Sequence, residues 1–336
     1  KVQRIKNSYC PTTNATAMSI LGIDLGGTKL AAAVFTAQGD VLSEETTPLE
    51  KRSGAETGAL LLSRINELIS EQKEKRNPVQ SIGIAVPGIS YKESGTVWAP
   101  NIPGWEAFPL EVEIRKLDQE IPFTIDSDRT CYMLGERWKG VARDCTDAIY
   151  LAVGTGIGAG ILVNGQILRG ANDIAGAIGW MALEKPFDEK YVECGCFESH
   201  AAGEGIVKKT MELLKRAGGY QGLLKNKMAG RISAYDIFDA YDKRDQIAIE
   251  VITHCIETWG MAIANLVSLF NPQKIILGGG VFGLAVRFIP LIREQASRWA
   301  QPISMKKVII EPSLLGRRAG LFGAAWLSMQ NNKAQA

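Results

Sequence analysis

The feature that most constrains the fold is a strand, glycine turn and strand pattern that occurs twice, about 130 residues apart. The first copy turns at Gly26-Gly27 and the second at the glycine-rich loop 154–160. Short apolar runs joined by glycines are typical of β-hairpins. The strands expected around the two turns are 19–25, 30–35, 148–153 and 161–163, with further strands at 80–86, 122–125 and 274–277 and helices at 54–75, 201–218, 244–270 and 319–329. This repetition predicts a duplicated α/β architecture, with two lobes and a central cleft.

Length and composition limit the class of protein. The 336 residues suffice for two domains, and the hydrophobic share of 46% and charged share of 22% are those of a globular chain. A net charge of +2 argues against a polyanion as the main partner, so we expect no nucleic acid. No apolar run approaches the roughly 20 residues of a membrane helix, and residues 1–17 lack the apolar core of a signal peptide. We expect an N-terminal extension at 1–17, no membrane contact and a cytoplasmic location.

The first glycine turn is suited to binding phosphate. Gly26 and Gly27 let backbone N–H groups approach an oxyanion, while Thr28 and Lys29 offer a hydroxyl and a cation. Asp24, at the end of the strand, is placed to hold a hydrated Mg²⁺ beside the phosphates. An ordinary hairpin with a surface lysine and a turn-capping aspartate explains the same residues equally well.

The second glycine loop also fits a dinucleotide-binding pattern, through Gly154, Gly156 and Ala159 with Asp173 about 20 residues further on. A dinucleotide loop must open a helix, however, and this one leads into an apolar run and an Asn-Gly turn. A third glycine loop, at 278–283, does precede a helical pattern but lacks the acidic partner. Three glycine loops at strand ends in one chain favour phosphate binding.

A short acidic segment follows the predicted strand 122–125. Asp126, Ser127 and Asp128 stand between that strand and a helical pattern at 131–140. A carboxylate at a strand end can accept the proton of a hydroxyl that attacks a γ-phosphate. Capping of the helix is the competing role, and it is expected of at least one of the three.

The order of these segments resembles the ROK family of repressors and sugar kinases, from about Met18 to the C-terminus. The resemblance implies an actin/hexokinase-like (ribonuclease H-like) fold, with a small lobe at 18–125 plus 318–336 and a large lobe at 126–317. The matching segments are Leu21–Lys29, Gly83–Gly88, Pro100–Trp105, Leu151–Gly160 with Leu168–Ala171, and Asn271–Gly280.

The resemblance implies roles for individual residues. Aligning on Leu134-Gly135-Glu136 puts the catalytic aspartate at Asp128 and replaces a sugar-binding asparagine by Ser127. The implied nucleotide and Mg²⁺ residues are Asp24, Gly26, Gly27, Thr28, Lys29, Gly154, Thr155, Gly156, Gly158, Gly278, Gly279 and Gly280, and the implied sugar contacts are Asn101, Ser127, Asp128 and Glu198, with Ala177 and Trp180 at two further sugar positions.

Two departures from the family pattern concern the acceptor and a zinc site. The family reads Gly-Glu-Ile-Gly-His where this chain reads Gly176-Ala177-Ile178-Gly179-Trp180, so a sugar-binding glutamate and a zinc-binding histidine are replaced. Of the family's zinc cysteines only Cys196 is matched, because the other two positions are Glu189 and Tyr191. We expect no structural zinc, although Cys194, Cys196 and His200 together remain an alternative set.

The altered residues bear on the substrate. Ala177 and Trp180 remove two hydrogen-bonding groups and add an aromatic face, which favours an acceptor changed at its anomeric end: a glycoside, an amino sugar or a cyclitol. The competing reading makes Trp180 a core residue that fills the space of the missing zinc site.

We therefore expect an ATP- and Mg²⁺-dependent kinase of a sugar-like hydroxyl, primary in type, with polyphosphate as the other donor to consider. A small-molecule substrate and a homodimer are implied by the resemblance. A catalytically silent or sugar-sensing relative is the alternative. The family's repressors carry a DNA-binding domain ahead of the first hairpin, whereas about 21 residues precede it here.

Overall fold

The computed structural model describes residues 3–5, 18–117, 120–227 and 232–335, and the chain divides into two compact units. Unit 1 comprises Lys1–Asp144, Arg169–Ala175 and Leu314–Ala336, and unit 2 comprises Cys145–Leu168 and Gly176–Ser313. The first segment of unit 1 thus ends at Asp144, later than the lobe boundary at 125/126 that we expect from the sequence. The limits of the two lobes stay a prediction. Most of the expected extension 1–17 lies outside the described residues.

Unit 1 is built on a sheet in which a central strand, β2, has an antiparallel hairpin on one side and parallel strands on the other. Along the sheet the order is β1 (Gln3–Ile5), β4 (Val41–Pro48), β3 (Lys29–Thr36), β2 (Ser19–Leu25), β5 (Val79–Val86) and β8 (Phe123–Ser127). The pairs β1–β4, β4–β3 and β3–β2 are antiparallel, and β2–β5 and β5–β8 are parallel. Strand β1 shows that part of the segment 1–17 belongs to this sheet.

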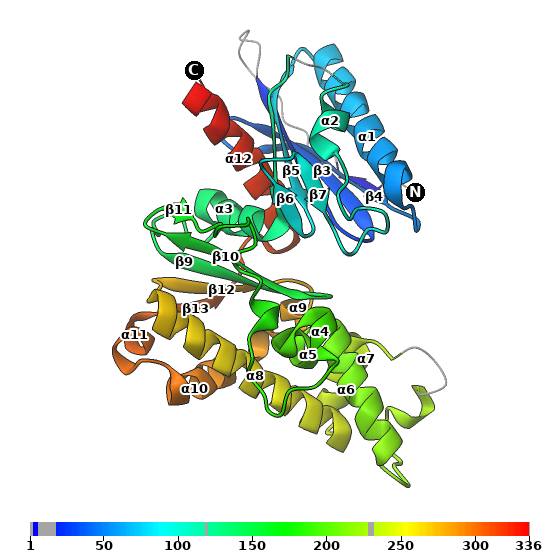
Figure 1. Ribbon diagram of the computed structural model, residues 1–336, viewed down its shortest axis with the longest axis vertical. Coiled ribbons are helices and arrows are strands. Elements are labelled where there is room, and N and C mark those ends of the chain that lie inside the picture. The colour runs from blue at the N-terminus through cyan, green and yellow to red at the C-terminus, as the bar shows by residue number, and fades with distance from the viewer. Residues whose placement is uncertain (1–2, 6–17, 118–119, 228–231, 336) are drawn as a thin grey trace. The chain divides into compact units, whose positions relative to one another are not determined.

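Helices cover both faces of this sheet (Figure 1). On one face α1 (Gly54–Glu74) and α2 (Leu110–Ile114) bury Leu61, Ile65 and Leu110 against the strands, together with the small hairpin β6 (Ile89–Tyr91) and β7 (Thr96–Trp98). On the other face α12 (Ala319–Gln335) packs against β2, β5 and α3 (Asp128–Lys139). The burial of both faces explains why β2 and β5 are apolar almost throughout.

Unit 2 repeats the arrangement of five strands of unit 1. Its sheet has the order β11 (Gln166–Ile167), β10 (Ile157–Val163), β9 (Ala148–Val153), β12 (Lys274–Gly278) and β13 (Ile309–Pro312). The pairs β11–β10 and β10–β9 are antiparallel, and β9–β12 and β12–β13 are parallel, the same sequence of pairings as β4-β3-β2-β5-β8. The duplicated α/β fold predicted from the two glycine turns is confirmed.

The helices of unit 2 pack around one long helix, α8 (Gln246–Phe270). By length and composition α8 could cross a membrane, but 67% of its most apolar stretch is buried inside the protein, as is usual for a core helix. The other helices are η1 (Ile178–Trp180), α4 (Tyr191–Cys194), α5 (Cys196–Ala201), α6 (Gly203–Arg216), η2 (Lys225–Lys227), α7 (Ala234–Asp242), α9 (Phe282–Ala285), η3 (Val286–Phe288), α10 (Ile289–Trp299) and α11 (Pro302–Lys307), with η4 (Gly316–Arg318) in unit 1.

Two element boundaries differ from the predictions in ways that matter for the site. Strand β10 begins at Ile157, so Gly158 and Gly160 lie in the ladder with β9, and the second turn is only Gly154–Gly156. Helix α3 begins at Asp128, directly after β8, and not near Cys131. The apolar pattern did not indicate these two boundaries, because small residues follow the first position of β10 and the first turn of α3 is charged.

Candidate functional site

The predicted site residues fall in both units. In unit 1, Asp24 lies near the end of β2, in register with Ala85 of β5, which in turn faces Asp126 of β8. Asp128 follows two residues later, at the first position of α3. Since β2, β5 and β8 are parallel, their carboxyl ends share one edge of the sheet, and this brings the two predicted carboxylates to the same place.

The carboxyl groups of Asp24 and Asp128 influence each other electrostatically. The surrounding protein raises the pKa of Asp24 to about 7, first by desolvation and second through the charge of Asp128, while Lys29 acts in the opposite direction. Desolvation also raises the pKa of Asp128, opposed by the charge and N–H of Arg129 and by the Tyr132 hydroxyl. The pair therefore holds a proton more readily than two exposed aspartates would.

The first glycine turn lies next to another predicted sugar contact. Gly26 N donates to Lys29 O at 2.9 Å and closes the turn, while Gly27, Thr28 and Lys29 are exposed. A side chain on Gly27 would lie 2.8 Å from Cβ of Asn101, so the loop that carries Asn101 packs directly on the turn. Within the described residues the N–H groups of Gly27 and Thr28 donate no hydrogen bond, which leaves them free for phosphate oxygens.

The other two residues of the acidic segment have structural partners. Ser127 is the N-cap of α3, accepting from Thr130 N at 3.4 Å, and it is buried. Asp126 is buried, and its Oδ2 forms an ion pair with Nη2 of Arg169 at 2.6 Å. Nζ of Lys92 lies 4.0 Å from the same oxygen. The capping role expected for at least one of the three residues thus belongs to Ser127.

Two residues near these carboxylates were missed by sequence reasoning. The Tyr132 hydroxyl donates to Asp128 Oδ2 at 3.3 Å, one helical turn further along α3, and the i, i+4 spacing could have indicated it. Gly320 of α12 lies so close to Asp24 that a side chain there would come within 2.3 Å of Asp24 Oδ2. No local pattern connects Gly320 with Asp24, because the two lie at opposite ends of the sequence.

In unit 2 the second and third glycine loops lie beside each other. Gly154 N donates to Gly156 O at 2.9 Å and closes the second turn, and Gly154 O accepts from Gly203 N at 2.8 Å. A side chain on Gly154 would lie 3.9 Å from Gly280 N, and Gly280 is exposed with open space around it. Gly278 lies in β12, with Gly279 directly after it. Thr155 is exposed at the tip of the second turn, whereas Gly158 belongs to β10.

Glu198 contacts both the second glycine turn and the segment 176–180, which departs from the family pattern. Its Oε2 accepts from Ile157 N at 2.6 Å, and side chains placed on Gly156 or Gly179 would lie within 2.7 and 2.9 Å of that oxygen. Desolvation raises the pKa of Glu198. Trp180 follows Gly179 and is 57% exposed, so the alternative that it fills the core is wrong. Ala177 is half-buried just ahead of η1.

The cysteine and histidine residues considered for zinc do not form the set envisaged. Cys194 Sγ lies 3.2 Å from the Ser199 hydroxyl, and Cys196 is buried. The ring of His200 instead contacts Tyr191, Glu184 and His254.

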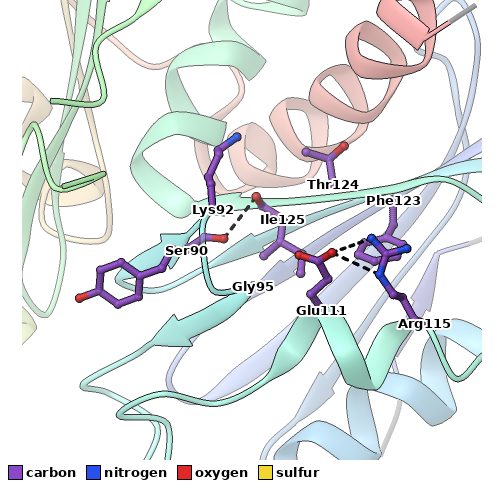
Figure 2. A pocket seen from close by; sticks show the side chains of 9 residues that line it. Ser90, Lys92, Gly95, Glu111, Arg115, Phe123, Thr124 and Ile125 are labelled. Carbon is purple, nitrogen blue, oxygen red and sulfur yellow. Dashed lines mark hydrogen bonds and ion pairs between the residues drawn. The ribbon is translucent and has the colours of Figure 1, made fainter. Parts of the chain in front are cut away.

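A polar pocket of about 170 Å³ in unit 1 lies apart from the predicted residues. Figure 2 shows Glu111 and Arg115 paired on one side of it, at 2.6 Å, and Ser90 donating to the Ile125 carbonyl on the other. None of the predicted site residues lines this pocket, and we assign it no role.

The folds of the two units and their glycine turns define a duplicated α/β protein of the actin/hexokinase-like class. The ROK family model matches residues 20–331, and the chain belongs to that family.

The chain is 31% identical over 324 residues to a glucokinase of Halalkalibacterium halodurans, covering 94% of this chain and 96% of that protein. It is also 31% identical over 318 residues to a xylose repressor of Caldicellulosiruptor bescii, covering 92% of this chain and 78% of the repressor. Among solved structures, a ROK family glucokinase from Streptomyces griseus in complex with glucose and AMPPNP matches with a TM-score of 0.75 and 27% identity, over 93% of this chain and 99% of that one.

Proposed function

We propose that this protein is an ATP- and Mg²⁺-dependent carbohydrate kinase with Asp128 as its general base. The observation that carries the proposal is the coupled pair Asp24 and Asp128, beside a turn whose exposed N–H groups face no partner in the described chain. The names of the glucokinase relative and of the glucose and AMPPNP complex support the same reaction class.

The raised pKa of Asp128 suits a general base. A carboxylate with a pKa nearer to neutrality accepts a hydroxyl proton more readily than an ordinary aspartate does. Arg129 N donates to Oδ1 of Asp128 at 2.7 Å and the Tyr132 hydroxyl donates to Oδ2 at 3.3 Å, and these contacts fix the orientation of the carboxylate. Each oxygen keeps a second lone pair that can accept the proton of a hydroxyl as it attacks the γ-phosphate.

Asp24 is the residue that fits Mg²⁺. Its carboxylate accepts no hydrogen bond from the described residues, and a hard cation prefers such oxygen donors, usually through water. A Mg²⁺ ion held by Asp24 would offset the negative charge of the β- and γ-phosphates. We assign phosphate contacts to Gly26, Gly27, Thr28 and Lys29 in unit 1, and nucleotide contacts to Gly154, Thr155, Gly156 and Gly278–Gly280 in unit 2.

The acceptor side departs from a plain glucose site. Because Ser127 is buried and caps α3, we do not assign it a sugar contact and retain Asn101 and Glu198. Trp180 offers an exposed aromatic face on which a sugar ring can stack. The acceptor we propose is a glycoside, an amino sugar or a cyclitol, phosphorylated on a primary hydroxyl where it has one.

The test is ADP release with Mg·ATP and a panel of glucose, alkyl glucosides, N-acetylhexosamines and inositols. We expect turnover with at least one acceptor, and faster turnover with the altered acceptors than with glucose. Polyphosphate in place of ATP checks the donor. Installing the family residues as Ala177→Glu with Trp180→His should raise glucose turnover. Equal glucose turnover in both proteins would count against an altered pocket, while leaving the kinase assignment intact.

A sugar-sensing role is the second candidate, since a repressor is as similar in sequence as the glucokinase. It predicts a sugar-induced rise in melting temperature with no ADP released in any condition. The coupled carboxylates favour the kinase, because a sensor needs no proton acceptor there. A cytoplasmic homodimer is the remaining expectation, and light scattering measures the oligomer directly.

A further inference from the structure

Both histidines of the chain lie together in unit 2. The sequence contains only two histidines in 336 residues, His200 in α5 and His254 in α8. Nδ1 of His200 and Nε2 of His254 are 3.2 Å apart, although the two residues are 54 positions apart in the sequence. Such convergence of the rarest polar residue on one point indicates a specific role.

A carboxylate completes the group. Oε2 of Glu184 lies 2.5 Å from Nε2 of His200, and Oε1 lies 3.9 Å from Nε2 of His254. One donor atom from each of the three residues can be chosen so that all lie within 4.8 Å of one another. The Tyr191 hydroxyl is a further neighbour, 2.7 Å from Nε2 of His200.

The spacing is that of ligands around one ion. Two nitrogens bound to Zn²⁺ at about 2.0–2.1 Å in a tetrahedron are about 3.3 Å apart, close to the separation of the two rings. Oε1 of Glu184 lies 3.9 Å from Nε2 of His254, and the Glu184 side chain is exposed and can turn toward an ion between the two rings. Tyr191 can then accept from the ring nitrogen of His200 that faces it, the outer contact that ligating histidines usually have.

We propose that Glu184, His200 and His254 bind one divalent transition-metal ion of the zinc class. Two imidazoles and one carboxylate are a donor set for Zn²⁺, and three protein ligands leave the fourth tetrahedral position to water. None of the three occupies a position that the family resemblance gives to a zinc ligand, since those positions are Trp180, Glu189, Tyr191 and Cys196. The proposal is independent of the kinase assignment.

The ion joins three separate segments of unit 2. Glu184 follows η1, which ends at Trp180; His200 lies two residues after Glu198 in α5; and His254 lies on the buried core helix α8. A bond to each fixes the exposed segment after η1 onto the core of unit 2. The ion would thus hold in place a segment, 181–190, whose side chains are mostly exposed.

The competing explanation is a hydrogen-bonded chain. His254 Nε2–H donating to His200 Nδ1, and His200 Nε2–H donating to Glu184, would satisfy the same distances without an ion. The two explanations differ in metal content and in the effect of a chelator.

The experiment uses untagged protein, stripped with a chelator and titrated with Zn²⁺ or with Co²⁺ as a spectroscopic probe. We expect about one ion per chain, visible d–d bands from Co²⁺, and no thiolate-to-cobalt band in the near ultraviolet. Saturating Zn²⁺ should raise the melting temperature by about 5 °C or more.

The diagnostic variants are Glu184→Gln and His254→Gln, because both positions are accessible enough to tolerate the change. Each should weaken Zn²⁺ binding by at least about tenfold, as even loss of an outer contact does. Glu193→Gln, an exposed carboxylate on α4, and Cys194→Ser are the matched controls and should bind as the parent does. Binding that is absent in the parent, unchanged in the diagnostic variants, or accompanied by a thiolate band overturns the proposal.

Discussion

The two glycine turns of this molecule follow strands with the same pairing pattern, but the residue two positions before the first glycine differs between them. In unit 1 the strand β2 reaches Gly26 two residues after Asp24, and in unit 2 the strand β9 reaches Gly154 two residues after Ala152. Asp24 faces Ala31 and Ala85 on its neighbouring strands, and Ala152 faces Gly158 and Gly278 in the same relation. The corresponding strand position therefore carries a carboxylate in unit 1 and a methyl group in unit 2.

This difference suggests that both turns can bind phosphate, whereas the carboxylates suited to phosphate transfer belong to unit 1. A turn with free N–H groups needs only the backbone, and both units supply it. The carboxylates to which we assign a Mg²⁺ ion and a proton, Asp24 and Asp128, both belong to unit 1. Unit 2 has Glu198 and Trp180 near its turn, and these suit ligand choice. Substitutions in the two units test this difference.

The largest effect is expected from Asp128→Asn, an isosteric change that removes the proton acceptor. We expect kcat to fall about 10²- to 10⁴-fold with little change in KM, since a general base contributes that much. The counterpart in unit 2, Glu198→Gln, should raise the KM of the acceptor and leave kcat nearly intact. Steady-state kinetics of both folded variants measures the split. A similar loss of kcat in the two would abolish the distinction between the units.

The second effect concerns stability and pH. Asp24 has a pKa of about 7 in the folded chain against an ordinary value of 3.8, so the folded state binds its proton more tightly than the unfolded state. That contribution is fully present below about pH 4 and is lost as the pH rises through 7, by as much as about 4 kcal/mol in the free energy of unfolding. Asp24→Asn should remove the slope and be the more stable protein at pH 8 without Mg²⁺.

Urea denaturation between pH 4 and pH 8 measures this dependence. Lys29 and Asp128 are the charged groups that act on Asp24, and both stay in place in the variant. Parallel stability curves for the parent and the variant would show that Asp24 is not desolvated in the way described.

The smallest effect is expected at the exposed aromatic of unit 2. Trp180→Ala should raise the KM of the preferred acceptor about 3- to 10-fold, the value of one aromatic contact, without change in the melting temperature. Trp299→Ala removes a tryptophan that is 69% exposed in the same unit and is the matched control. If both variants behave alike, Trp180 does not contact the acceptor.

Much of the fold could be predicted because strong patterns specify it. The buried runs of β2, β5 and β9, the turns at Gly26 and Gly154, and the long apolar spacing of α8 each determine their own element. The hairpin β6–β7 and the strand β13 could not be predicted, because three or four residues are too few to show a period.

Candidate site residues could be named from the sequence where they adjoin a turn or a strand end. Asp24 and Gly27 adjoin a turn, and the segment 126–128 follows a strand, although Asp128 was selected within it only by the family resemblance. Gly320 against Asp24 and Asn101 against Gly27 are contacts between distant segments, which no local pattern records. The meeting of Glu184, His200 and His254 likewise depends on how α5 and α8 pack, and not on any spacing in the sequence.

The grouping of both histidines in unit 2 has a consequence for unit 1. An imidazole is the side chain whose ordinary pKa lies within the range of cellular pH. Unit 1 contains none, so any response of this unit to acidification must come from a carboxyl group displaced far from its usual titration range. Asp24 is such a group, and it would make the chemical centre of the protein, and not its surface, the part that senses protons.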